Sequence, residues 1–116
     1  MDIHQLLVGC EKVLGLGWTK ETWTVGGKKH FRLVLFRDGI AWFAQISPID
    51  TVVVGLERPI NGVVWQISCA GFDVNSAFIS LLLGVEKEVA KGTDFSVVAK
   101  QVRDTLASKI WGKTTT

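Results

Sequence analysis

The sequence predicts an α+β fold with an N-terminal helix, a five-stranded antiparallel meander and two C-terminal helices packed mainly on one sheet face. Apolar residues recur at helical spacing near both ends of the chain. Between them lie short alternating apolar runs, which is the pattern of half-buried strands. The dipeptides Gly26-Gly27 and Asp38-Gly39 separate these runs and are typical of two-residue hairpin turns.

The N-terminal helix is predicted from a cap followed by an apolar stripe. Asp2 is the expected N-cap, and Gln5 stands at the capping-box position. Gly15 or Gly17 is expected to end the helix. The stripe consists of Ile3, Leu6, Leu7, Cys10, Val13 and Leu14.

A hairpin from Lys28 to Ile46 forms the predicted centre of the sheet. Its two-residue turn at Asp38-Gly39 sets the register of the hairpin, so Leu35 is expected opposite Trp42 and each later pair follows two residues at a time. The face expected to be buried gathers Phe31, Leu33, Leu35, Trp42, Ala44 and Ile46. The other face carries the predicted pairs Phe36 with Ala41, Val34 with Phe43, Arg32 with Gln45 and His30 with Ser47. That second face therefore changes from apolar near the turn to polar at the open end.

Three further strands complete the predicted meander. A strand from Glu21 to Val25 precedes the hairpin and sets Trp23 opposite His30 and Glu21 opposite Arg32. A short strand from Thr51 to Leu56 follows the hairpin, and the segment 57–62, with Pro59 and Asn61-Gly62, is expected to turn the chain back. The last strand is predicted from Val63 to about Ala70.

The C-terminal part predicts two helices and a disordered tail at about 113–116. Asp73 caps the first of them, and Thr93 or Asp94 caps the second. Ile79 and Leu83 fall outside the apolar stripe of the first helix. We therefore expect that helix to lie beneath its neighbour or in a subunit contact.

Composition predicts a single domain over residues 1–116. Hydrophobic residues make up 47% and charged residues 21%, which excludes a disordered chain. The net charge of +2 falls short of the basic excess of a typical nucleic-acid binder. The sequence shows neither a secretory signal nor an apolar run of membrane-spanning length, so we expect a cytoplasmic protein without membrane contact. Cys10 and Cys69 are expected to be buried, reduced thiols.

No motif in the sequence predicts catalysis, a cofactor or a metal. The four His and Cys residues lack paired ligand spacing, and the glycines match neither phosphate-binding pattern. A GxSxG nucleophile motif is also absent. An enzyme whose site forms only in three dimensions is the third alternative.

The function predicted first is a binding module that acts through the second sheet face, by self-association as a homodimer or with another protein. The predicted binding residues are Trp23, His30, Arg32, Val34, Phe36, Phe43 and Gln45. The alternative is single-stranded nucleic-acid binding, in which Trp23, His30 and Arg32 form a stacking platform with cations. The cations of the segment 20–37 favour this alternative, whereas the modest net charge favours the protein interface.

Leu35→Asp is predicted to abolish cooperative folding, because it would bury an unpaired carboxylate in the core. Thr22→Asp, on a flanking strand, should be milder. Thermal unfolding followed by circular dichroism measures both variants. A near-normal cooperative transition in Leu35→Asp would contradict the predicted register.

Overall fold

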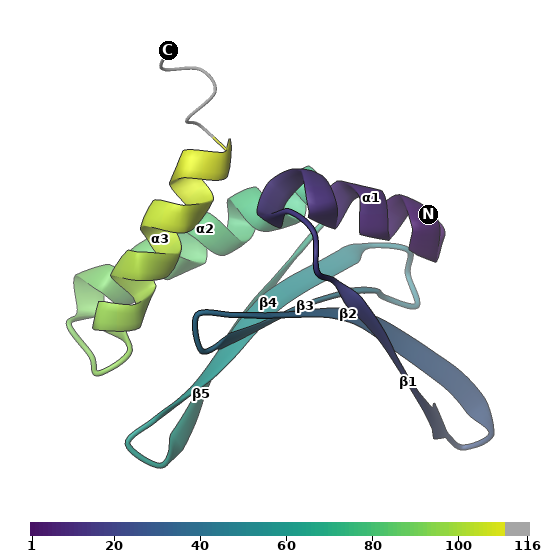
Figure 1. Ribbon diagram of the computed structural model, residues 1–116, viewed down its shortest axis with the longest axis horizontal. Helices are drawn as coiled ribbons and strands as arrows, with labels where there is room; N and C mark the ends of the chain where they lie inside the picture. The colour runs from purple at the N-terminus through teal and green to yellow at the C-terminus, as the bar shows by residue number, and fades with distance from the viewer. Residues whose placement is uncertain (111–116) are drawn as a thin grey trace.

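The computed structural model describes residues 1–110 and has the predicted α+β architecture (Figure 1). The predicted tail at 113–116 lies outside the described residues. The elements are α1 (Ile3–Leu14), β1 (Thr19–Val25), β2 (Lys28–Arg37), β3 (Ile40–Ile46), β4 (Val52–Ile60), β5 (Val63–Gly71), α2 (Val74–Lys91) and α3 (Ser96–Ile110).

The sheet is an antiparallel meander in the order β1-β2-β3-β4-β5. Three of its four connections are two-residue turns, at Gly26-Gly27, Asp38-Gly39 and Asn61-Gly62, and residues 47–51 join β3 to β4. Both residues of each turn have positive φ, between 51° and 80°, which is the type I′ conformation that fits the twist of a hairpin. The predicted pairs nearest the turns are confirmed, including Trp23 with His30 and Leu35 with Trp42.

All three helices lie on one side of the sheet (Figure 1). The core forms between them and the central strands, where Leu33, Leu35 and Trp42 are at most 3% exposed. Three alternate residues of β4, Val52, Val54 and Leu56, are fully buried on the same face. The helices thus bury the face that the alternation pattern predicted, over β3, β4 and the turn-proximal half of β2.

The predicted pairing of β2 with β3 is wrong at the open end of the hairpin. The ladder ends at Leu33 with Ala44, so the pairs Phe31–Ile46, Arg32–Gln45 and His30–Ser47 are not part of it. The chain after Ile46 turns toward β4 instead, because the Ser47 N–H donates to the Thr51 carbonyl at 2.8 Å. The first half of β2 therefore continues with β1 alone.

This divergence leaves the β1–β2 hairpin without a helical cover. All seven residues of β1 are exposed, and no helix described in residues 3–110 packs over that strand. Phe31, which was predicted to be core, is 36% exposed, and the Lys20 ammonium lies 5.5 Å from the centre of its ring. Ile46 is only half-buried. The buried face is consequently narrower than predicted.

Strand β4 runs through Pro59, although the sequence predicted a turn from Glu57 onward. Pro59 faces Val64, and the β3–β4 ladder ends two residues earlier at Ala41 with Glu57. The Asn61-Gly62 turn makes Ile60 and Val63 a hydrogen-bonded pair, so the even-numbered residues of β4 bond to β5. An N–H at residue 59 would point to the other side, where β3 has already ended. The missing donor at Pro59 therefore breaks no ladder bond, and the β4–β5 hairpin extends beyond the β2–β3 turn.

Gly55 allows a close approach in the middle of the sheet. A Cβ at this position would lie 2.6 Å from the Ile67 carbonyl oxygen and would overlap the ring of Phe43. Phe43 points away from the helices, yet it is only 7% exposed because its ring lies over Gly55. The absent side chain at Gly55 thus explains how an aromatic residue is buried on the uncovered face.

Helices α1 and α2 begin with capping boxes, at Asp2 with Gln5 and at Asp73 with Ser76. The hydrogen bonds from Ser76 lower the pKa of Asp73. Helix α2 packs against both α3 and β5, and Leu83 remains 54% exposed on its outer side. None of the helices described in residues 3–110 is long and apolar enough to cross a membrane.

Gly55→Ala is expected to destabilise the protein by about 1 to 3 kcal/mol, because the new methyl would overlap a backbone carbonyl and the Phe43 ring. Gly84→Ala is the matched control, since its Cβ would meet side chains alone, the flexible end of Ile67 at 3.2 Å and the Cys69 sulfur at 3.5 Å, and the helix would gain propensity. Urea unfolding of both variants measures the difference. Equal effects of the two substitutions would contradict the role given to Gly55.

Candidate binding face

The sheet face opposite the helices is uncovered by any described element and is called the open face here. Its members across the sheet are Thr19, Glu21, Trp23, Val25, Lys28, His30, Arg32, Val34, Phe36, Ala41, Phe43, Gln45, Val53, Gly55, Glu57, Pro59, Val64, Gln66, Ser68 and Ala70. In Figure 1 the β1–β2 and β4–β5 hairpins both bend away from the helices. The open face is therefore concave.

The polar end of the open face is organised around Arg32. The Arg32 Nε donates to the Glu21 carboxylate at 2.9 Å, across the β1–β2 ladder. The Arg32 guanidinium carbon also lies 5.9 Å from the centre of the Trp23 ring and 5.7 Å from that of Phe43. The ring of His30 stacks beside Trp23, with 5.7 Å between centroids and an interplanar angle of 18°. Arg32 therefore links the polar end to the buried aromatic centre.

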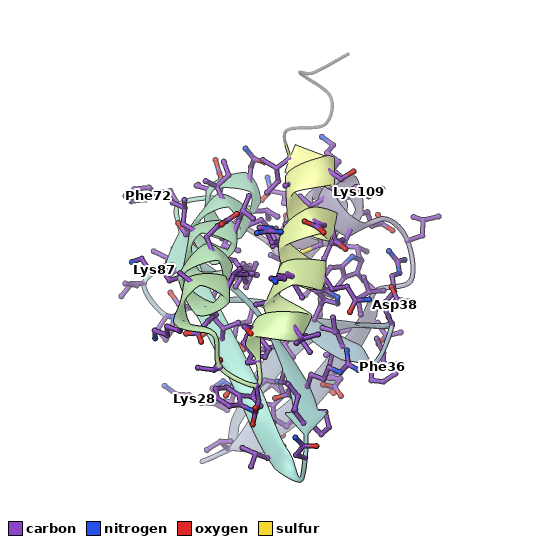
Figure 2. The ribbon with its side chains drawn as sticks, turned by 90° about the vertical axis from the view of Figure 1, so that its left-hand side faces the viewer. Lys28, Phe36, Asp38, Phe72, Lys87 and Lys109 are labelled. Atoms are coloured by element: carbon purple, nitrogen blue, oxygen red, sulfur yellow. The ribbon has the colours of Figure 1, made fainter. Side chains whose placement is uncertain are left out.

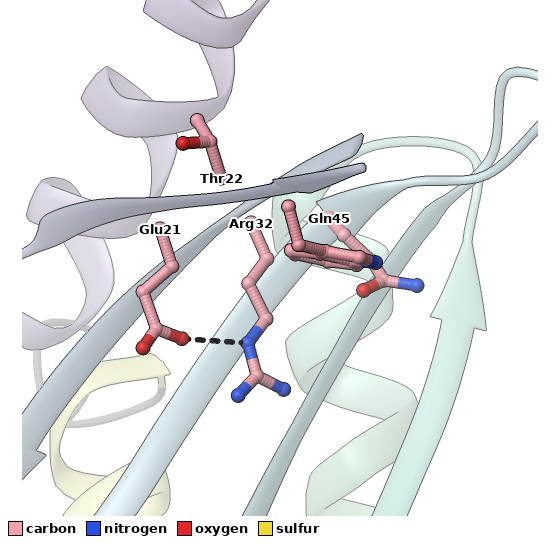
Figure 3. Close-up of a pocket in the computed structure, with 5 residues that line it drawn as sticks. Glu21, Thr22, Arg32 and Gln45 are labelled. Atoms are coloured by element: carbon pink, nitrogen blue, oxygen red, sulfur yellow. Dashed lines mark hydrogen bonds and ion pairs between the residues drawn. The ribbon is translucent and has the colours of Figure 1, made fainter. Parts of the chain in front are cut away.

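Two hollows of about 400 Å³ each border this cluster, and they share Trp23 and Gln45. The first is lined by Glu21, Thr22, Trp23, Arg32 and Gln45 (Figure 3). The second lies where β2 and β3 diverge and is lined by Trp23, Lys29, His30, Phe31, Gln45, Ile46, Ser47 and Pro48. Each has a volume at the lower end of the range for ligand pockets.

The apolar end of the open face is smaller than the sequence predicted. Phe36 is 74% exposed, Val34 is half-buried, and Phe43 is buried between Gly55 and Arg32. Val64, at the tip of the β4–β5 hairpin, is 62% exposed on the same face. Alternation along β5 placed Val64 on this face, but the predicted binding set did not include it. Val25, at the tip of the β1–β2 hairpin, is 59% exposed on this face as well. The exposed apolar side chains Phe36, Val64 and Val25 are thus divided among three places on the rim.

The cations predicted to favour nucleic acid do not gather at one place. Lys20 and Lys29 lie on the opposite face of the β1–β2 hairpin from Arg32. Arg37 donates to the carbonyl oxygens of Leu14 and Leu16 and so caps the C-terminus of α1. On the open face, the two cations Lys28 and Arg32 are matched in number by the carboxylates of Glu21 and Glu57. The face consequently has no basic excess.

The described residues offer little reactive chemistry. Among residues 1–110, no three His, Cys, Asp or Glu side chains come together as a metal site. Burial raises the pKa of the Cys10 thiol to about 12, with a smaller effect from the Glu11 carboxylate. Burial also raises the pKa of Cys69, and the nearby Lys87 ammonium opposes that rise. Neither thiol is activated as a nucleophile.

Comparison of the chain with protein-family models, with curated proteins and with solved structures found no match. Any function is therefore inferred from the chain's own geometry. The structure brings the predicted Trp23, His30, Arg32 and Gln45 together at the polar end, and it leaves Phe36 separate from them at the β2–β3 turn.

Arg32→Ala is expected to destabilise the fold more than Glu21→Gln, because Arg32 covers two aromatic rings as well as pairing with Glu21. An exposed ion pair contributes about 0.2 to 1 kcal/mol, and each exposed cation–π contact adds about 0.5 to 1 kcal/mol. Urea unfolding of both single variants and of the double variant gives the coupling energy. Equal losses in the two single variants would contradict a covering role for Arg32.

Proposed function

We propose that this chain is a protein-binding module whose open face receives an apolar segment of another protein. The observation that carries the proposal is the one-sided cover of the sheet. Helices bury one face, while the concave opposite face keeps Phe36 74% exposed and Val64 62% exposed. An exposed apolar side chain at the edge of a concave surface is suited to anchor a partner, because its burial contributes about 1.5 to 3 kcal/mol.

The polar end of the open face supports the proposal because its hydrogen-bonding groups could fix the orientation of a bound partner. Protein interfaces combine apolar anchors with a polar rim that forms directional hydrogen bonds. The Gln45 amide and the Glu21 carboxylate line the hollow beside Trp23. Trp23 is 41% exposed, so part of its indole ring can still be covered by a partner.

Charge favours a protein partner over a nucleic acid. Single-strand binding needs cations that neutralise phosphates along the strand. Arg32 is already paired with Glu21, and the open face carries as many carboxylates as cations. Stacking of bases on Trp23 would also compete with His30 and Arg32, which both lie against its ring.

Phe36→Asp is expected to reduce capture of the specific partner by at least about tenfold, a free-energy change of about 1.4 kcal/mol. Immobilised protein is incubated with cell extract, and the retained proteins are quantified by mass spectrometry. Val97→Asp is the matched control, because Val97 is 75% exposed on α3, which lies on the other side of the sheet from the open face. Proteins retained by wild type and Val97→Asp but lost with Phe36→Asp would support the proposal. Equal retention by all three would contradict it.

A titration with a fluorescent single-stranded oligonucleotide tests the alternative. We expect weak binding at physiological salt that does not change in Trp23→Ala. Tight binding that falls with salt by a log-log slope of about 0.7 per phosphate contact, and that Trp23→Ala abolishes, would replace the protein-binding proposal with a nucleic-acid one.

A further inference from the structure

Strand β5 is an edge strand without the usual protection against pairing with another chain. It is nine residues long, VVWQISCAG, and contains no charged residue and no proline. Soluble proteins commonly protect exposed edges with lysine, proline, bulges or a covering segment. The other edge, β1, carries Lys20 and Glu21. The two edges of this sheet therefore differ in their capacity to accept a further strand.

The free backbone groups of β5 can be assigned from its turn. The two-residue turn at Asn61-Gly62 makes Ile60 and Val63 a hydrogen-bonded pair, so the odd-numbered residues of β5 bond to β4. The outward N–H and C=O groups belong to Val64, Gln66, Ser68 and Ala70. None of the backbone hydrogen bonds formed outside helices and ladders among residues 1–110 involves these four residues.

The side of helix α2 beside this edge carries Leu83 together with Lys87, whose ammonium lies near Cys69 of β5. Gly84 faces Ile67 and Cys69 of β5, and by helical spacing the buried residues Phe78 and Leu82 lie on another side of α2. Leu83 is 54% exposed on the remaining side. In Figure 2, Lys87 and Phe72 project from the side of α2 that faces away from α3. Phe72, which directly follows β5, is 91% exposed.

We infer that β5 pairs antiparallel with β5 of a second copy of this chain, joining the two sheets edge to edge about a twofold axis. An uncharged strand can pair with itself without placing like charges opposite each other. The twofold arrangement closes the assembly with two copies, whereas β5 paired with β1 of the next copy would add further copies as a ring or an open filament. The same axis brings the side of α2 that carries Leu83 and Lys87 toward its counterpart, so Leu83 can be covered along with the strand while Lys87 stays hydrated at the rim.

The edge dimer leaves the Phe36 end of the open face available. Phe36 and Asp38 lie on the opposite side of the molecule from Phe72 and Lys87 in Figure 2. Pairing of β5 would therefore place two open faces side by side in one continuous sheet, each with its own Phe36. The inference does not depend on the proposed partner of the open face.

Amide hydrogen exchange, measured by NMR on the full chain from low to high micromolar concentration, tests the inference. Exchange at Val64, Gln66, Ser68 and Ala70 should slow at least about tenfold as the dimer forms, because their N–H groups become paired. Exchange at Trp65, Ile67 and Cys69 is the internal control, since these amides already bond to β4. Solution mass over the same concentrations should rise from monomer to dimer.

The double variant Gln66→Lys/Ser68→Lys is expected to remain monomeric, because it places lysines on an exposed edge where twofold pairing would bring them together. Thr22→Lys/Thr24→Lys is the matched control, since it adds the same charge to the other edge at exposed, outward-pairing positions. Thermal unfolding verifies that both variants fold.

A wild-type chain that stays monomeric with fast edge exchange would overturn the inference. So would a dimer that persists in Gln66→Lys/Ser68→Lys. A dimer lost in Phe36→Asp but retained in the β5 variant would instead assign self-association to the open face. The edge dimer is expected to persist in Phe36→Asp, which separates this inference from the proposed function.

Discussion

Burial of β3 and β4 beneath the three helices is the interaction on which the rest of the structure depends. Ala44, Val52, Val54 and Leu56 are fully buried there, against helical residues such as Phe78 and Leu81 that are also fully buried. Because α1 lies near β3 and α2 lies over β4 and β5, the helical layer does not reach β1. The β1–β2 hairpin therefore projects from the body, and the divergence of β2 from β3 opens the hollow beside Trp23.

Arg32 compensates on the open face for the missing helical cover. Its guanidinium lies near both Trp23 and Phe43, and its Nε bonds to Glu21. An arginine can cover aromatic surface with its planar head and still remain hydrated, so it reduces exposed apolar area without a second layer. Through the same contacts the Arg32 guanidinium is already paired, so it is not free to neutralise a phosphate. The contacts that let Arg32 cover the aromatic rings therefore also make it a poor phosphate ligand.

The two candidate interaction surfaces differ in their chemistry. The open face offers side chains, with Phe36 and Val64 as apolar anchors and Gln45 as a hydrogen-bonding group. The β5 edge offers backbone donors and acceptors at regular spacing, which a strand can match but an irregular segment cannot. Partner binding at the first surface and twofold pairing at the second are compatible, since the first uses side chains of the open face and the second uses backbone groups of β5.

The sequence by itself determined the α+β class, the order of elements and the register near each tight turn. These features follow from local chemistry: helical or alternating periodicity, and turn dipeptides such as Asp38-Gly39 that adopt positive φ. The caps at Asp2 and Asp73 were predictable for the same reason. The predicted binding residues also fell on one face, because alternation assigns faces without knowledge of the fold.

Only the tertiary structure decided which of those residues are accessible. Phe43 is buried because Gly55, on the neighbouring strand, leaves room for its ring, and Phe31 is exposed because no helix extends over it. Pro59 continues β4 because β3 has already ended beside it. In each case the deciding contact, or its absence, involves an element distant in sequence. Periodicity assigns a residue to a face, but the burial of that face depends on where the other elements end.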